Sequence, residues 1–259
     1  RAAKYAEAAA EVRETFCKHL WSEEQGRFLR RIDPVDTDRV AEFMSDLFED
    51  REPRASLPEV IQNLPGTPDH GEAQAAHDEV KYLPDNNPDA SMFAIFTMGL
   101  LPADDERVQA TMKAVEDRLT VKTNVGGVAR YVDDYYHQVS QDTENIPGNP
   151  WFICTLWMAD YRIARATTEA ELREAAVYLD WVAERALPSG VLAEQVHPET
   201  NAPLSVSPLT WSHATVAATV TSYLGKLRAI RKAALTGDRV EPGPPEPEPL
   251  RDPALPVSV

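Results

Sequence analysis

Residues 149–164 read NPWFICTLWMADYRIA, and this stretch decides the fold class. Asn149 and Pro150 suit the N-cap and the first turn of a helix. The residues that follow are apolar around most of the helical circumference, so the helix is predicted to be buried on nearly every side. Such a helix needs other helices around it, which places the chain among the all-α proteins.

Two other stretches share this character. They are SMFAIFTMGLL at 91–101 and LTWSHATVAATVTSYL at 209–224, both apolar or small on all sides. The three buried helices begin near residues 89, 151 and 208, which spaces them roughly sixty residues apart. An inner layer of buried helices inside an outer layer of one-sided helices predicts a helical toroid or double barrel.

Three stretches predict the one-sided helices. Residues 5–20 repeat apolar side chains at helical spacing. Asp104 is the expected N-cap of a second helix, whose apolar face runs to Leu119. Thr168 and Glu171 form a capping box that opens a third helix.

Composition narrows the class of protein. The chain has 259 residues, with 26 basic against 42 acidic side chains and a formal charge of −16. This acidic excess argues against nucleic acid as a partner, because phosphate backbones bind clusters of Lys and Arg. The sequence holds no run of eighteen uncharged apolar residues and no apolar core of a signal peptide near its start. We therefore expect a cytoplasmic protein without a membrane partner.

One large domain is expected at this length. The helical pattern occupies residues 1–236, interrupted at 33–87 by a proline-punctuated segment that is predicted to be mostly irregular. A short apolar pattern at 40–48 lies inside that segment. Residues 237–259 hold seven of the 21 prolines and are predicted to be an extended or disordered tail.

The cysteines and histidines do not indicate a metal site. Cys17 and Cys154 lie in predicted helices among apolar neighbours, where a free Cys behaves as a small buried hydrophobe. His70 and His77 stand among acidic residues, but a solvated loop is favoured there because no Cys/His pair has zinc-ligand spacing. No metal or other cofactor is expected.

The first long loop concentrates side chains that bind sugars. It reads VKTNVGGVARYVDDYYHQVSQDTENIPGNP at 121–150, and its Gly126–Gly127 pair indicates a turn. Carboxylates and a guanidinium can bind sugar hydroxyls while aromatic faces lie against the ring. The alternative is an Arg–Asp pair that braces a long loop. The candidates, within seven positions, are Arg130, Tyr131, Asp133, Asp134, Tyr135 and Tyr136.

The second long loop reads LPSGVLAEQVHPETNAPLSVSP at 187–208. Glu194 lies in it among apolar neighbours and next to Gln195. A carboxylate held there can take a proton from water as a general base, and the alternative is a solvated loop Glu. Ser212 and His213 are adjacent and are interpreted as polar groups at a helix start, not as a nucleophile and its base.

Four motifs together resemble the glucoamylase-like glycoside hydrolases of family 15. The resemblance covers about Ala2 to Leu235, apart from the proline-rich segment at 33–87. It implies an (α/α)6 barrel that hydrolyses α-glucosidic bonds from non-reducing ends. The motifs are GGVARYVDDYY (126–136), GNPWFICTLWMADY (148–161), GVLAEQVHPET (190–200) and PLTWSHA (208–214).

The resemblance implies roles for particular residues. Glu194 matches the general base that activates the attacking water, and Gln195 beside it is expected to position that water. Arg130 and Asp134 match the residues that bind glucose in the first subsite. Trp151 and Trp211 match two aromatic positions of the family pattern. The ring of Trp151 suits packing equally well.

One element of the family pattern is missing. The family's general acid lies upstream in a Trp-Glu-type motif, and this chain has none. An inverting glycosidase needs two carboxylates about 6.5–9.5 Å apart. We therefore expect residues 1–236 to be the C-terminal portion of the barrel, completed by a missing N-terminal half. If the chain acted alone, Asp133 or Glu144 would be the first candidate for the second carboxylate.

The expected function is hydrolysis of α-glucosidic bonds with inversion, without a cofactor. The expected substrates are an α-glucan, a maltooligosaccharide or trehalose. Two alternatives stay open at this stage: a trehalase of the same family, and a non-catalytic sugar-binding or regulatory glucoamylase-like domain.

Overall fold

The computed structural model describes residues 2–34 and 82–243. The chain divides into two units, one of residues 31–85 and one formed by residues 1–30 with 86–259. In the smaller unit, β3 (Ile32–Pro34) pairs antiparallel with β4 (Tyr82–Pro84). The predictions for the apolar pattern at 40–48 and for His70 and His77 lie outside the described residues.

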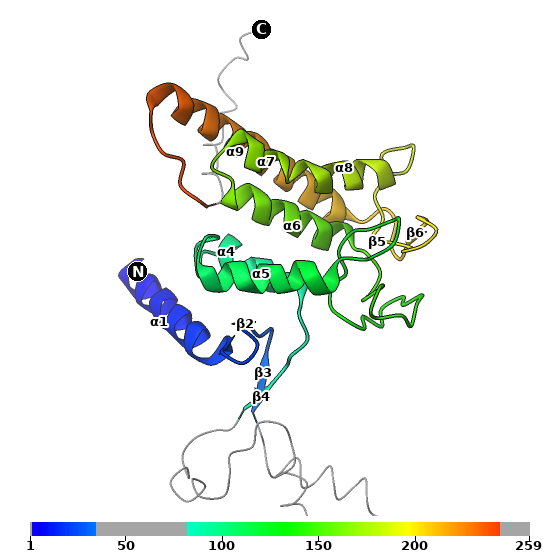
Figure 1. Cartoon of the computed structure of the whole chain (residues 1–259), viewed down its shortest axis with the longest axis horizontal. Helices are drawn as coiled ribbons and strands as arrows, with labels where there is room; N and C mark the ends of the chain where they lie inside the picture. Colours follow the sequence, from blue (N-terminus) through cyan, green and yellow to red (C-terminus); the bar gives the residue numbers. More distant parts are fainter. Residues whose placement is uncertain (1, 35–81, 244–259) are drawn as a thin grey trace, which may run out of the picture. The chain divides into compact units, whose positions relative to one another are not determined.

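The larger unit is predominantly helical in its described part, in agreement with the predicted all-α class (Figure 1). Two short antiparallel pairs, β1–β2 and β5–β6, join its helices. Its elements are α1 (Ala2–Leu20), β1 (Trp21–Ser22), β2 (Arg27–Phe28), the 3-10 helix η1 (Ala90–Phe93), α4 (Ala94–Thr97), α5 (Glu106–Leu119), α6 (Phe152–Arg165), α7 (Glu169–Arg173), α8 (Ala176–Arg185), β5 (Gln195–Val196), β6 (Pro203–Leu204) and α9 (Thr210–Thr236).

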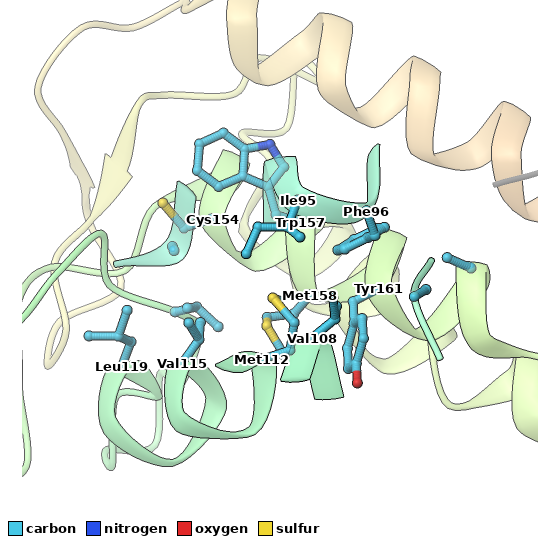
Figure 2. Packing of buried hydrophobic residues seen from close by; sticks show 14 of the residues in the cluster. Ile95, Phe96, Val108, Met112, Val115, Leu119, Cys154, Trp157, Met158 and Tyr161 are labelled. Atoms are coloured by element: carbon cyan, nitrogen blue, oxygen red, sulfur yellow. The ribbon is translucent and has the colours of Figure 1, made fainter. Parts of the chain in front are cut away.

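Helix α6 lies at the centre of the larger unit, as its sequence predicts. It packs against η1, α7, α8 and α9, and most of its residues are buried. Each of the three hydrophobic clusters contains α6 side chains, so this helix holds the clusters together. Figure 2 shows the first cluster, in which side chains of α5, α4 and α6 meet. They include Ile95, Phe96, Val108, Met112, Val115, Leu119, Cys154, Trp157, Met158 and Tyr161.

The other two helices predicted to be buried differ from the prediction. The stretch 91–101 forms only η1 and α4, and it turns at Met98, which is 76% exposed, and Gly99, whose φ is +72°. Helix α9 buries one narrow face against α6 and exposes Trp211, Val220 and Leu224. Small apolar residues on every side of a helix therefore did not ensure burial within this chain.

Helix ends follow local chemistry only in part. The capping box of Thr168 and Glu171 is confirmed, although it opens the short helix α7, after which α8 begins separately. The N-cap of α5 is Asp105, one residue after the predicted Asp104. The prediction that Asn149 caps α6 is wrong, because the N-cap is Trp151 and has no side-chain capping bond.

The start of the predicted tail packs against the helices. Gly243 N donates to Ala164 O at 2.8 Å, and the half-buried Val240 joins the third cluster. The buried ammonium of Lys226 donates to the backbone oxygens of Ala164 and Glu241, at 3.2 and 3.3 Å. Residues 238–243 are therefore held against the helices, although they form no helix or strand.

Two further sequence predictions concern single features. Cys17 and Cys154 are both free; Cys154 is buried, and burial raises the pKa of its thiol well above the ordinary value. Within the described ranges, no helix combines the length and apolar character that a membrane crossing needs.

The Gly126–Gly127 turn supplies a stability test. Both glycines have left-handed backbones, with φ of +65° and +86°. A Cβ on Gly127 would lie 2.5 Å from the Trp181 ring and 2.8 Å from Pro150 Cβ, whereas one on Gly126 would lie 3.8 Å from Trp181. Gly127→Ala should therefore destabilise the protein more than Gly126→Ala, by about 1–3 kcal/mol. Urea unfolding of both variants measures this, and equal losses would contradict the packing argument.

Asp160 predicts a pH dependence of stability. Burial on α6 raises the pKa of its carboxyl from 3.8 to about 6. The folded state therefore favours the neutral acid, and its contribution to stability is lost as the pH rises through about 6. Asp160→Asn should stabilise the protein at pH 7.5 by about 1–2 kcal/mol and change little at pH 4. Urea titrations at both pH values test this against Asp180→Asn, an exposed control; an equal gain at pH 4 would contradict it.

Candidate sugar-binding and catalytic site

Backbone bridges shape the loop between α5 and α6. Thr120 pairs with Val128, and Ala129 pairs with Pro150. The Trp181 indole Nε1 donates to Val125 O at 2.7 Å, and this bond ties the Gly126–Gly127 turn to α8. The two ends of the loop are thus held side by side, and the residues between them, including Arg130, are fixed against the start of α6.

Arg130 and Asp134 form a bidentate ion pair within this loop. Arg130 Nε donates to Asp134 Oδ2 at 3.0 Å, and Nη2 donates to Oδ1 at 2.6 Å. Asp134 is 1% exposed, and its Oδ1 also accepts the backbone N–H of Tyr136 at 3.1 Å. Both oxygens of Asp134 are therefore engaged inside the loop. This geometry makes Asp134 the anchor of Arg130, and it satisfies the loop-bracing alternative as well.

Aromatic rings surround the guanidinium. Its carbon lies 4.7 Å from the ring centroids of Tyr131 and Trp151, and Nη2 also donates to the Tyr131 hydroxyl at 3.1 Å. Burial lowers the pKa of Arg130, but the hydrogen bonds and charge of Asp134 outweigh it and leave that pKa above its ordinary value. Arg130 therefore stays charged, and Nη1 is the one guanidinium nitrogen without a hydrogen bond to the described residues.

Two residues that the sequence analysis did not single out support this arrangement. The guanidinium carbon of Arg30 lies 5.0 Å from the ring centroid of Tyr131, and Arg30 pairs with Asp89 at 3.3 Å. Asp89 also forms a backbone bridge with Tyr131 and caps η1. The Asp-Ala-Ser sequence at 89–91 was a usable signal, because an Asp before a buried helical segment is an N-cap pattern.

Glu194 lies on a segment that is hydrogen-bonded on several sides. Its N–H donates to Val206 O at 2.9 Å, and its backbone oxygen accepts the N–H of Phe152 at 3.3 Å. The carboxylate accepts a hydrogen bond from the hydroxyl of Ser205. Glu194 is half-buried, so it is neither a freely solvated loop residue nor sealed in the core.

Ser212 and His213 hold this segment from α9. The buried Ser212 hydroxyl donates to Ala193 O at 2.8 Å, and His213 Nε2 accepts the N–H of Leu192 at 3.1 Å. They were interpreted as polar groups at a helix start, and they do lie in the first turn of α9. Their hydrogen bonds show a further task, since they fix the residues immediately before Glu194.

Gln195 joins the two loops. It is 0% exposed, forms a backbone bridge with Trp151, and accepts a side-chain hydrogen bond from Asn149 at 2.8 Å. The Trp151 ring also makes a cation–π contact with the guanidinium of Arg130. The predicted residues Arg130, Trp151 and Gln195 therefore form one connected group. Glu194 adjoins this group through the chain.

Tyr136 joins this group, because its ring centroid lies 5.8 Å from the Arg130 guanidinium and 5.9 Å from the Trp151 ring. Three other predicted residues lie apart from it. Trp211 is 53% exposed on α9, and its ring neighbour is Trp157, with centroids 6.0 Å apart. Asp133 and Glu144 are exposed, and Asp133 accepts a hydrogen bond from Gln138. No described contact joins these three residues to Arg130 or Glu194.

Comparison with known proteins identifies the family. The family model described as "Glycosyl hydrolases family 15" matches residues 2–177. The chain belongs to this family. Arg130, Asp134 and Trp151 of this family 15 chain lie inside the match, while Glu194, Gln195 and Trp211 lie beyond it. The resemblance stated from the sequence is therefore confirmed, and the roles of the residues stay predictions.

Three similar proteins are all much longer than this family 15 chain. An uncharacterized glycosyl hydrolase of Methanocaldococcus jannaschii is 33% identical over 152 residues, 53% of this chain and 23% of that protein. A trehalase of Thermoplasma acidophilum is 27% identical over 136 residues, 52% of this chain and 21% of the trehalase. The crystal structure of a bacterial glucoamylase complexed with acarbose has 26% identity and a TM-score of 0.47, covering 56% of this chain and 22% of the glucoamylase.

The ion pair between Arg130 and the buried Asp134 of this family 15 chain predicts a stability difference. Arg130→Lys should destabilise the protein by about 1–3 kcal/mol, because a single ammonium nitrogen cannot reproduce the two parallel hydrogen bonds that the planar guanidinium donates to the buried Asp134. Arg231→Lys is the matched control: Arg231 also contacts both oxygens of a carboxylate, Glu169, but this pair is exposed. The control should change stability by under about 0.5 kcal/mol. Urea midpoints compare the two, and equal shifts would contradict the importance of burial.

Proposed function

We propose that this chain is part of an exo-acting α-glucoside hydrolase that inverts the anomeric configuration, with Glu194 as the general base. The observation that carries the proposal is the placement of Glu194. Its backbone is hydrogen-bonded to Phe152 and Val206, and the next residue pairs with Trp151, on whose ring Arg130 rests. The carboxylate of Glu194 and the guanidinium of Arg130, whose Nη1 has no hydrogen bond to the described residues, are thus both held at the start of α6.

In the proposed reaction, Glu194 takes a proton from a water molecule while the water oxygen attacks the anomeric carbon of the terminal glucose. The glycosidic bond breaks on the opposite face, and a general acid protonates the leaving oxygen. The products are glucose of inverted configuration and the shortened saccharide. Arg130, held by Asp134 and flanked by aromatic rings, is proposed to bind the sugar hydroxyls through Nη1.

We propose that the general acid comes from a part of the enzyme outside this chain, of which residues 1–236 form the C-terminal portion of an (α/α)6 barrel and residues 237–259 a tail. Two facts support this. The glycosyl hydrolase of Methanocaldococcus jannaschii and the trehalase of Thermoplasma acidophilum are matched over only 23% and 21% of their length. Helix α9 also exposes Trp211, Val220 and Leu224, an apolar face that further helices of the same barrel would cover.

The proposed substrates are maltooligosaccharides and α-glucans. Trehalose is the second candidate, favoured by the similarity to the trehalase of Thermoplasma acidophilum. Both are α-glucosides with a terminal glucose, so one base and one sugar-binding Arg would serve either. A cytoplasmic location stays a prediction beside this proposal.

The decisive variant is Glu194→Gln in the intact enzyme. The amide keeps the shape of the side chain but cannot accept the proton of water, so turnover of maltose or trehalose should fall by about 10²–10⁴-fold. Glu199→Gln is the matched control, because Glu199 is exposed on the same loop and should leave turnover unchanged. Initial rates and circular dichroism spectra are measured for both variants.

A loss below about threefold for Glu194→Gln would remove this residue from the catalytic role. The 259-residue chain is assayed beside the intact enzyme with maltose, a maltooligosaccharide and trehalose. We expect it to release no glucose, because no partner acid is present. Glucose release that Glu194→Gln abolishes would contradict the external general acid and direct attention to Asp133 and Glu144.

A further inference from the structure

Asn149 and Gln195 form a buried amide pair between the two loops. Asn149 is 2% exposed and Gln195 0% exposed. Asn149 Nδ2 donates two hydrogen bonds, one to His137 O at 2.7 Å and one to Gln195 Oε1 at 2.8 Å. Asn149 lies just before the first residues of α6, but it caps nothing there. Its side chain is therefore committed to the contact between the loops.

The chemistry of these two hydrogen bonds fixes the orientation of both amides. The backbone oxygen of His137 can only accept, so Asn149 must turn its NH₂ group toward it. The second hydrogen of that NH₂ group needs an acceptor, so Gln195 must turn Oε1, and not Nε2, toward Asn149. A flipped Gln195 would oppose two donors. The backbone oxygen of His137 thus fixes the orientation of the Asn149 amide, which in turn fixes that of the Gln195 amide.

The ordering leaves donors unused. Asn149 Oδ1 is buried without a hydrogen-bond partner among the described residues, and so are two donors, Gln195 Nε2 and the Trp151 indole Nε1. The two donors belong to residues that face each other across the Trp151–Gln195 backbone bridge. A buried donor without an acceptor is costly, and such groups in native proteins call for a specific explanation. Both donors need an acceptor.

We propose that Asn149 is a positioning residue: it locks the amide of Gln195 so that Nε2 is the donor presented to the sugar or to the attacking water beside Glu194. This inference rests on the proposed function and deepens it. It assigns the task of Gln195 to one atom, Nε2, and explains why an Asn stands before α6 where its capping role is absent.

A double-mutant cycle in the intact enzyme tests this. Asn149→Ala removes the lock, and Gln195→Met removes the amide while keeping the length of the side chain. Each should lower kcat/KM by about tenfold or more, measured per active site titrated with 1-deoxynojirimycin. The kcat/KM of the double variant should lie within about threefold of that of the less active single variant, because Asn149 acts only through Gln195. Asn145→Ala, an exposed Asn of the same loop, should match the unaltered enzyme.

Several outcomes would overturn the inference. Losses that multiply in the double variant would show that Asn149 acts independently of Gln195. An Asn149→Ala variant that loses thermal stability but keeps kcat and KM per active site would show a purely structural role. Asn149→Ser is prepared as a second variant, and failure of both Asn149 variants to fold would likewise assign this residue to the fold alone.

The outcome is separable from that of the proposed function. If the intact enzyme hydrolyses neither maltose nor trehalose, or if Glu194→Gln leaves the rate unchanged, the proposed function fails. The same cycle is then read from the affinity for 1-deoxynojirimycin by calorimetry. Non-additive losses of affinity in the Asn149 and Gln195 variants would still support the positioning role, and unchanged affinities would refute it.

Discussion

Burial of α6 is the constraint on which the rest of the larger unit depends. This helix contributes side chains to all three hydrophobic clusters, and its entry residue Trp151 pairs with Gln195 on the segment that carries Glu194. The loop with Arg130 ends at the same point, through the bridge between Ala129 and Pro150. Two loops far apart in sequence are therefore fixed to one helix end.

Polar groups around this point are arranged in a fixed order. Asp134 accepts hydrogen bonds from Nε and Nη2 of Arg130 and from the N–H of Tyr136, and Nη1 of Arg130 has no hydrogen bond within the part of the chain that the structure describes. Asn149 Nδ2 donates to Gln195 Oε1, and Gln195 Nε2 has no hydrogen-bond partner among residues 2–34 and 82–243. In both cases a buried partner binds some of the polar atoms of a side chain. The atoms that remain, Nη1 of Arg130 and Nε2 of Gln195, are both hydrogen-bond donors.

Local signals in the sequence predicted local structure well. The all-round apolar pattern predicted α6, and the capping box predicted the start of α7, because each depends on neighbours within one or two turns. Long-range partners were not predictable. Asn149 reads as an N-cap, yet its hydrogen bonds go to His137 and to Gln195, which lies 46 residues away.

In the candidate site too, local contacts were predictable from the sequence and distant ones were not. The Arg130–Asp134 spacing is local, and the ion pair forms. The support of the Glu194 segment by Ser212 came from a helix that follows in sequence, so no spacing rule could indicate it. The prediction that α9 is buried on all sides was wrong, because the composition of a helix does not say which elements cover it.

The most direct test of the account is a crystal structure of the intact enzyme with 1-deoxynojirimycin, because the central claim is that Arg130 and Glu194 serve one sugar. The account predicts that Nη1 of Arg130 and the carboxylate of Glu194 lie on the same bound ring, with Nη1 within about 3.2 Å of a hydroxyl and the carboxylate facing the anomeric position directly or through one water. An inhibitor ring bound away from either residue would contradict it.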